Sequence, residues 1–72
     1  MEYRADMVAS VQQVLVSVGQ HVVSGDTLVM LESMKMEIPV FASADGSVQE
    51  VAVTAGDVVQ EGDVLVICTP MG

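Results

Sequence analysis

The sequence has very few basic residues and no long apolar run. Its 72 residues include only two basic side chains, Arg4 and Lys35, against ten acidic ones, so the formal net charge is −8. Phosphate binding requires clustered Lys and Arg, so this composition argues against a nucleic-acid partner and against an anionic membrane surface. The longest apolar run, residues 64–68, falls far short of the roughly 18 residues that a membrane-spanning helix needs.

Cysteine and aromatic residues are also scarce. Cys68 is the only cysteine, so an internal disulfide is excluded and a reducing compartment, the cytoplasm, is expected. Residues 1–4 show no basic segment followed by an apolar one, so no signal peptide is predicted. Because Tyr3 and Phe41 are the only aromatic residues, the core of this small chain must be aliphatic. We expect a single domain spanning residues 1–72.

The sequence is rich in valine and contains an internal repeat. Sixteen residues are valine, and β-branched side chains favour strands. Residues 10–31 align without gaps to residues 47–68, at an offset of 37, and eleven of the 22 aligned positions are identical. This repeat predicts two similar halves related by a pseudo-twofold axis.

Each repeat carries the same order of strand and turn signals. In the first, Val14, Val16 and Val18 alternate with Gln13, Leu15 and Ser17, which is the period of a strand, and the alternation breaks between Val11 and Val14. This break predicts a bulge or sharp bend. A Gly-x-x-Val-x-x-Gly-Asp turn at 19–26 and a continuous apolar strand at 28–31 follow. The same features recur 37 residues later, with the break between Val48 and Val51, the alternation over 51–55, the turn at 56–63 and the apolar strand at 64–68.

The segment between the repeats supplies another strand and an exposed tip. Residues 38–42 read as a strand, in which Pro39 should lie at an edge or at the strand start because it cannot donate to a ladder. Residues 32–37 lack the Asn-Gly or Asp-Gly of a two-residue primed turn, which favours a type I turn. The sequence thus predicts an all-β fold, a flattened barrel or sandwich of two four-stranded halves, with residues 32–37 at a hairpin tip.

Lys35, the only side-chain amine, lies between two methionines at this tip. From composition alone it could be an ordinary solvated lysine or the target of a specific amine modification. Met34 and Met36 are unusual at an exposed tip, because apolar tips invite aggregation. They either pack partly against the hairpin or provide an adaptable surface for partners.

Residues 32–37, with the sequence Glu-Ser-Met-Lys-Met-Glu, resemble the attachment motif of biotinyl domains. The core of that motif is Met-Lys-Met, usually preceded by Ala or Ser, and Ser33 departs only from the commoner alanine. The two glycine turns resemble the flanking turns of the biotinyl/lipoyl domain family, and the resemblance covers about residues 4–68. It implies the barrel-sandwich hybrid fold of that family, with the attachment lysine on a hairpin tip.

The resemblance implies a biotin carrier that is not itself an enzyme. A biotin protein ligase would join biotin to Lys35 through an amide, and Met34 and Met36 would be recognised by the ligase and by the carboxylase. The biotin would be carboxylated at a biotin carboxylase site and would deliver the carboxyl group at a carboxyltransferase site. No residue of the chain resembles a base that could activate Lys35, so the ligase would supply activation. We expect the isolated chain to be monomeric.

Two other functions stay open. A lipoyl carrier would have the same fold and lysine position, although lipoyl domains usually place Asp-Lys-Ala at the tip. An acidic β-module could instead bind a protein partner without being modified. Three weaker candidates remain: His21, expected in a turn; Cys68, expected as a buried, inert thiol; and a possible calcium cluster of Asp57, Glu61 and Asp63, which lacks EF-hand spacing.

Overall fold

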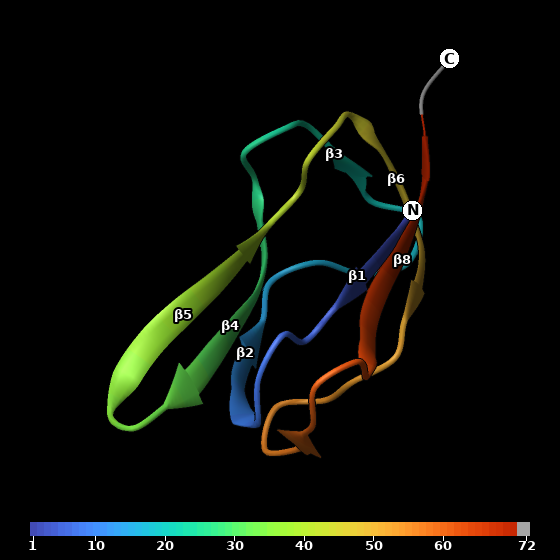
Figure 1. The fold of residues 1–72 in the computed structure, drawn as a ribbon. Helices are drawn as coiled ribbons and strands as arrows, with labels where there is room; N and C mark the ends of the chain where they lie inside the picture. Colours follow the sequence, from blue (N-terminus) through green and yellow to red (C-terminus); the bar gives the residue numbers. More distant parts are fainter. Residues whose placement is uncertain (71–72) are drawn as a thin grey trace.

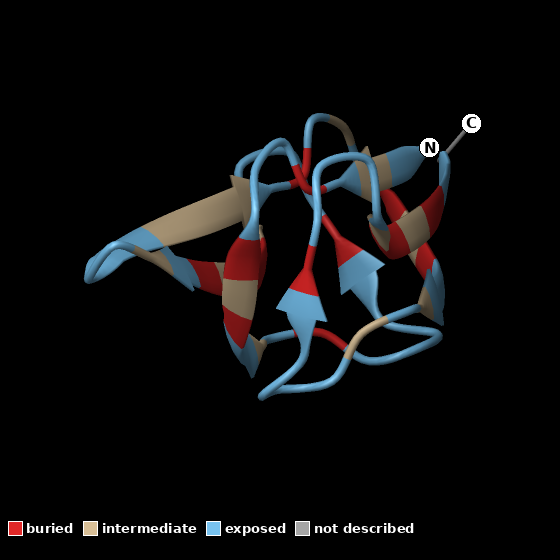
Figure 2. Ribbon diagram, turned by 60° about the horizontal axis from the view of Figure 1, so that its bottom comes forward, coloured by how far each residue is buried: buried red, intermediate tan, exposed pale blue. Residues whose placement is uncertain are grey.

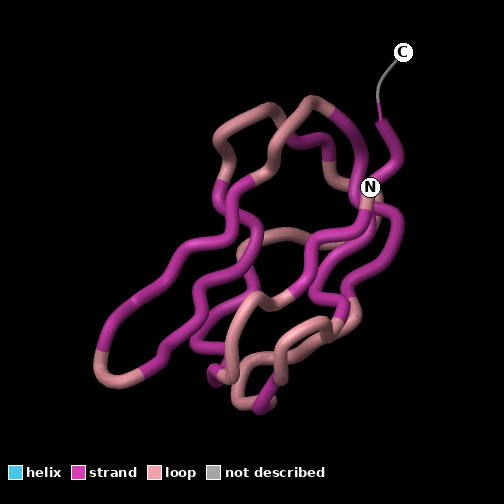
Figure 3. The backbone as a smooth tube through the Cα atoms, viewed as in Figure 1, coloured by secondary structure: helices cyan, strands magenta, loops and turns pink. Residues whose placement is uncertain are grey.

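The computed structural model describes residues 1–70, which consist of strands and loops (Figure 3). The two sheets are antiparallel and four-stranded, with the orders β1-β8-β6-β3 and β5-β4-β2-β7, which confirms the predicted all-β fold. Over the described residues, no helix is long and apolar enough to cross a membrane. The strands are β1 (Glu2–Arg4), β2 (Ala9–Val14), β3 (His21–Val22), β4 (Thr27–Ser33), β5 (Met36–Phe41), β6 (Gly46–Val51), β7 (Val58–Val59) and β8 (Val64–Pro70).

The sequence repeat relates the two sheets. Adding 37 to the residue numbers carries β2, β3 and β4 onto β6, β7 and β8. The short strands are exchanged, however, because β3 pairs with β6 and β7 pairs with β2. The amide of Gly19 donates to the Val48 carbonyl, and the equivalent Gly56 amide donates to the Val11 carbonyl, both at 2.8 Å. Each repeat therefore contributes its short strand to the sheet that contains the long strands of the other repeat.

Both predicted bulges are present. The register of β2 against β4 shifts between Val11 and Gln13, and that of β6 against β8 shifts between Val48 and Glu50. These shifts lie where the apolar alternation of the sequence changes phase.

The strands predicted over residues 14–18 and 51–55 are wrong, because β2 ends at Val14 and β6 ends at Val51. The Leu15 amide still donates to the Leu28 carbonyl of β4 at 3.0 Å, and the chain then crosses from β2 in one sheet to β3 in the other. Of the alternating valines in this segment, Val16 is in the core at 7% exposed, whereas Val18 is 65% exposed.

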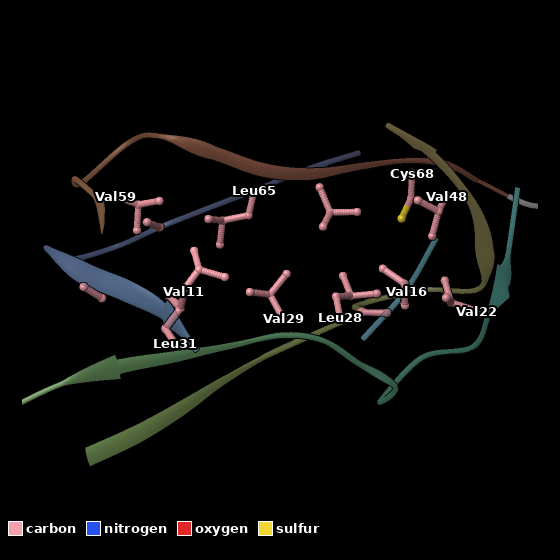
Figure 4. Close-up of a cluster of buried hydrophobic side chains, with 14 residues drawn as sticks. Val11, Val16, Val22, Leu28, Val29, Leu31, Val48, Val59, Leu65 and Cys68 are labelled. Atoms are coloured by element: carbon pink, nitrogen blue, oxygen red, sulfur yellow. The ribbon is translucent and has the colours of Figure 1, made fainter. Parts of the chain in front are cut away.

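The core lies between the two sheets and is aliphatic, as predicted (Figure 4). The central valines of the two glycine turns, Val22 and Val59, are 1% and 3% exposed and anchor these turns to it. The largest fully buried side chains come mainly from β4 and β8 and include Leu28, Val29, Leu31, Leu65 and Val66.

The hairpin of β4 and β5 projects from the body, at the opposite end of the molecule from the two chain ends (Figure 1). This projection contributes to an elongated shape, with principal extents of 37 × 18 × 18 Å. β5 is an edge strand of its sheet, so Pro39 occupies the edge position predicted for it.

Candidate functional site

The site is built on the tip of the β4–β5 hairpin. The ladder between these strands runs to the pair Ser33 and Met36, which leaves Met34 and Lys35 as a two-residue loop. On the other side of β4, the ladder to β2 ends at the pair Ser10 and Glu32. Only the last residues of the hairpin therefore extend beyond the sheet, and Lys35 lies at the tip as predicted.

The predicted type I turn is wrong. The φ angles of Met34 and Lys35 are 52° and 64°, and positive φ at both central residues is the mark of a type I′ turn. A two-residue loop must match the right-handed twist of its strands, and a type I turn would splay them. The pairing of Ser33 with Met36 thus imposes a backbone that the local residue types do not favour. Each positive φ at a residue with a side chain costs about 1 kcal/mol or more.

The residues of the tip are exposed to solvent, as their pale blue colour in Figure 2 shows. Met34 is 90% exposed and Met36 is 60% exposed, and Lys35 is exposed as well. Met34 therefore does not pack against the hairpin, and Met36 does so only in part. Two apolar side chains that the protein itself does not bury are available to a partner on either side of the amine.

Two carboxylates lie on the stem of the hairpin, which we define as the paired residues 31–33 and 36–38 next to the turn. Glu32 and Glu37 are directly opposite each other across the hairpin and are exposed. Within residues 1–70 the only ion pair joins Arg4 to Glu2, so neither hairpin carboxylate forms one with the Lys35 ammonium. The amine is therefore not sequestered by the part of the chain that the structure describes.

Two serine hydroxyls tie the stem to the body. Ser33 Oγ donates to the Val8 carbonyl at 3.3 Å, and Ser10 Oγ donates to the Glu32 carbonyl at 3.5 Å. The Ser33 contact lies beyond the last bridge of the β2–β4 ladder, so a side chain extends that ladder toward the tip. The sequence alone assigned Ser33 no role, and the only signal was its departure from alanine in the motif.

The acidic cluster of the second glycine turn has a structural task. Asp57 Oδ2 accepts a hydrogen bond from the Thr54 amide at 2.8 Å, and Asp63 Oδ2 accepts one from the Gln60 amide at 2.9 Å. Both carboxylates border a depression of about 350 Å³ beside β7. Glu61 is exposed in the same turn. The first two carboxylates close turns of the backbone, as short polar side chains commonly do.

The remaining candidates lie away from the hairpin tip. Cys68 is 1% exposed in β8, which confirms the predicted buried thiol. Burial raises the pKa of this thiol, and the N-terminal ammonium, which donates to the Cys68 carbonyl at 2.6 Å, opposes the effect to a smaller extent. His21 is exposed in the short strand β3, where it pairs with Ser47, and not in a turn.

Comparison with known proteins finds a matching family model and similar proteins. Residues 4–68 match the biotin/lipoyl family model described as "Biotin-requiring enzyme". The chain is 58% identical over 45 residues to the "Biotinylated protein TB7.3 homolog" of Mycobacterium leprae; this segment spans 62% of this chain and 63% of that protein. The similarity thus extends over slightly less than two thirds of the relative.

Two solved structures have the same fold. A single-chain, multi-domain long-chain acyl-CoA carboxylase contains a region that matches with a TM-score of 0.93 and 33% identity, over 100% of this chain and 7% of that chain. The lipoyl domain of the 2-oxoglutarate dehydrogenase complex from Azotobacter vinelandii matches with a TM-score of 0.79 and 29% identity, over 90% of this chain and 82% of that chain.

Proposed function

Because the chain belongs to the biotin/lipoyl attachment family, as a biotinyl domain, we propose that it carries biotin joined through an amide to Nζ of Lys35. One observation supports this assignment above the others. The only side-chain amine of the chain stands at the tip of a two-residue turn, at the end of a hairpin that projects from the body.

The residues of the tip fit such an attachment. A ligase must enclose Nζ in its own active site, and the exposed turn allows a partner to approach Lys35 together with Met34 and Met36. Methionine suits this task because its side chain is flexible and polarizable and adapts to several apolar surfaces. Glu32 and Glu37 on the stem would face basic groups of the partner, which favours fast and correctly oriented encounters.

The chain and its partners would divide the chemistry. When bound, biotin supplies a ring nitrogen that accepts a carboxyl group at one active site and releases it at another. The chain supplies the flexible side chain of Lys35 as a tether and holds the attachment point away from its own core. Tethering raises the effective concentration of the attached group at each active site within reach. Removal of the proton from the Lys35 ammonium before amide formation would fall to the ligase.

The partners follow from the same assignment. The similarity to a region of a long-chain acyl-CoA carboxylase supports a role beside a biotin carboxylase and a carboxyltransferase. We place the chain in the cytoplasm as a monomeric, non-catalytic carrier. The fold is shared with a lipoyl domain, so it does not discriminate between the two cofactors. The two methionines beside Lys35 and the biotinylated relative favour biotin over lipoate.

A labelling experiment tests the proposal. The wild-type chain and Lys35→Arg are incubated with a biotin protein ligase, biotin and ATP, and are then probed with streptavidin. Arginine keeps the positive charge but provides no amine that forms the amide, so we expect label on the wild type alone. Circular dichroism checks that both chains are folded. Equal labelling of Lys35→Arg would contradict the assignment of Lys35.

A further inference from the structure

The sulphur-containing residues that the structure describes differ widely in their exposure to solvent. Met30 is half-buried in β4, and the Met1 thioether accepts weak hydrogen bonds from the hydroxyls of Tyr3 and Ser43, at 3.9 and 3.8 Å. The exposed fractions are 1% for Cys68, 36% for Met7, 39% for Met1, 60% for Met36 and 90% for Met34. Met34, directly before Lys35, is therefore the most exposed sulphur-containing residue of the part of the chain that the structure describes.

We infer that Met34, and to a smaller extent Met36, is a site of reversible oxidation by peroxides, and that this modification changes how the hairpin tip is recognised. The sulphur lone pair attacks one oxygen of hydrogen peroxide, the S–O bond forms and the O–O bond breaks. Sulphur loses two electrons and becomes a sulfoxide. The second peroxide oxygen leaves as water and takes both protons with it. A methionine sulfoxide reductase reverses the change with a dithiol as the electron donor: the dithiol is oxidised to a disulfide, and the sulfoxide oxygen leaves as water.

The thiol does not compete for the oxidant. The reactive form of cysteine is the thiolate, and Cys68 is enclosed in the core between the two sheets. Oxidation of Cys68 requires opening of the fold, whereas oxidation of Met34 requires no movement. A peroxide therefore reaches the hairpin tip before it reaches the core.

The consequence rests on the proposed function. Met34 and Lys35 form the two-residue turn together, so a ligase that encloses Nζ must also contact Met34. Oxidation converts a flexible apolar side chain into a polar, chiral one. A partner surface that receives the thioether in an apolar environment would then have to bury an unpaired S=O dipole, which is unfavourable. Met36 is less exposed than Met34, so its oxidation should be slower and should change recognition less.

The first arm of the test needs no ligase. The chain is treated with limiting hydrogen peroxide, the reaction is quenched with catalase, and sulfoxides are located by tandem mass spectrometry. Trypsin cleaves after Lys35, which separates Met34 from Met36. We expect Met34 to oxidise at least about 2.5-fold faster than Met7, the ratio of their exposed fractions, 90% and 36%. Equal rates at Met34 and Met7 would overturn the inference.

The second arm measures ligation of biotin before and after peroxide treatment. Oxidised wild-type chain should be ligated about tenfold more slowly than untreated chain, and sulfoxide reductase should restore the rate. The matched control is the double variant Met34→Leu, Met36→Leu, which keeps apolar side chains without sulphur. Whatever its initial rate, peroxide should leave that rate unchanged. An equal slowing of the double variant would show that other sulphurs are responsible and would reject the inference.

The oxidation and ligation measurements together distinguish a failure of this inference from a failure of the proposed function. If untreated wild-type chain is not ligated, the biotin assignment fails, and the order of sulfoxide formation still decides whether Met34 is the preferred oxidation site. If untreated chain is ligated and the oxidised chain is ligated at the same rate, the carrier function stands and the effect of oxidation on recognition is rejected.

Discussion

Ser33 donates a hydrogen bond from its hydroxyl to the Val8 carbonyl, 3.3 Å away, and so joins the residue beside the turn to the segment that leads into β2. β4 has no strand neighbour on this side beyond Glu32. The contact is therefore the last hydrogen bond that links this side of the hairpin to the body before the tip. It holds the end of the projecting hairpin to the body two residues before Lys35.

Ser33→Ala should loosen the tip more than it destabilises the fold. A single partly exposed hydrogen bond contributes about 1 kcal/mol or less, so the free energy of unfolding should fall by no more than that. Nuclear magnetic resonance should show faster amide exchange and lower order parameters at Met34 and Lys35. Ser10→Ala, which removes the longer contact nearer the body, is the control and should change the tip less. Identical dynamics in both variants would refute this role of Ser33.

The positive φ of Lys35 favours glycine at this position, whereas the proposed function requires lysine. Glycine adopts positive φ without the penalty that a side chain brings, so Lys35→Gly should be more stable than Lys35→Ala by about 0.5–1 kcal/mol. Both variants should lose biotinylation, and both should keep the native circular dichroism spectrum. Urea denaturation provides the comparison. If Lys35→Ala proved the more stable of the two, the positive φ at this position would be in doubt.

Gly25 and Gly46 should resist substitution for different reasons. Gly25 has a φ of 96°, and a Cβ added there would meet no atom within 4 Å, so Gly25→Val should cost about 1–3 kcal/mol through backbone strain alone. At Gly46 an added Cβ would lie 2.5 Å from the Thr69 carbonyl oxygen, so even Gly46→Ala must push β6 away from β8. Thermal unfolding measures both losses, and unchanged melting midpoints would contradict these assignments.

Cys68 should make the stability depend on pH in the alkaline range. Burial raises the pKa of the folded thiol, so the folded chain holds its proton at pH values where an unfolded thiol, with a pKa of about 8.5, releases it. The contribution of the protonated Cys68 thiol to the free energy of unfolding is complete below about pH 8.5 and is lost as the pH rises toward the folded-state pKa. Urea unfolding at several alkaline pH values should show a steeper decline for wild type than for Cys68→Val. Parallel declines would assign the pH dependence to other groups.

The internal repeat made much of the fold predictable. The phase break between Val11 and Val14 located a bulge correctly, and Pro39 lies on an edge strand, one of the two positions predicted for it. The alternation after Val14 wrongly predicted that the strand continues, because a period of two does not report whether a neighbouring strand is present, and of its valines Val16 is buried whereas Val18 is 65% exposed. The exchange of β3 and β7 between the halves depends on long-range pairing, which local patterns do not encode.

The position of the site was predictable, and its backbone geometry was not. Lys35 stands at a hairpin tip as its flanking strands predicted, but Met34 and Lys35 are not residues that favour positive φ. The type I′ turn is imposed by the twist and register of β4 and β5, a tertiary constraint that overrides the local preference. The hydroxyl of Ser33 acts on a carbonyl 25 residues away, and a contact of that span leaves no local pattern.

Intact mass spectrometry decides whether Lys35 carries biotin. The folded wild-type chain is incubated with a biotin protein ligase and ATP, with biotin and lipoate both present, and is then weighed and digested with trypsin. We expect one biotin per chain and loss of the cleavage after Lys35, because trypsin does not cut at an acylated lysine. A lipoate adduct, an adduct on the N-terminal amine, or no adduct on a chain shown to be folded would contradict the assignment of this protein as a biotin carrier.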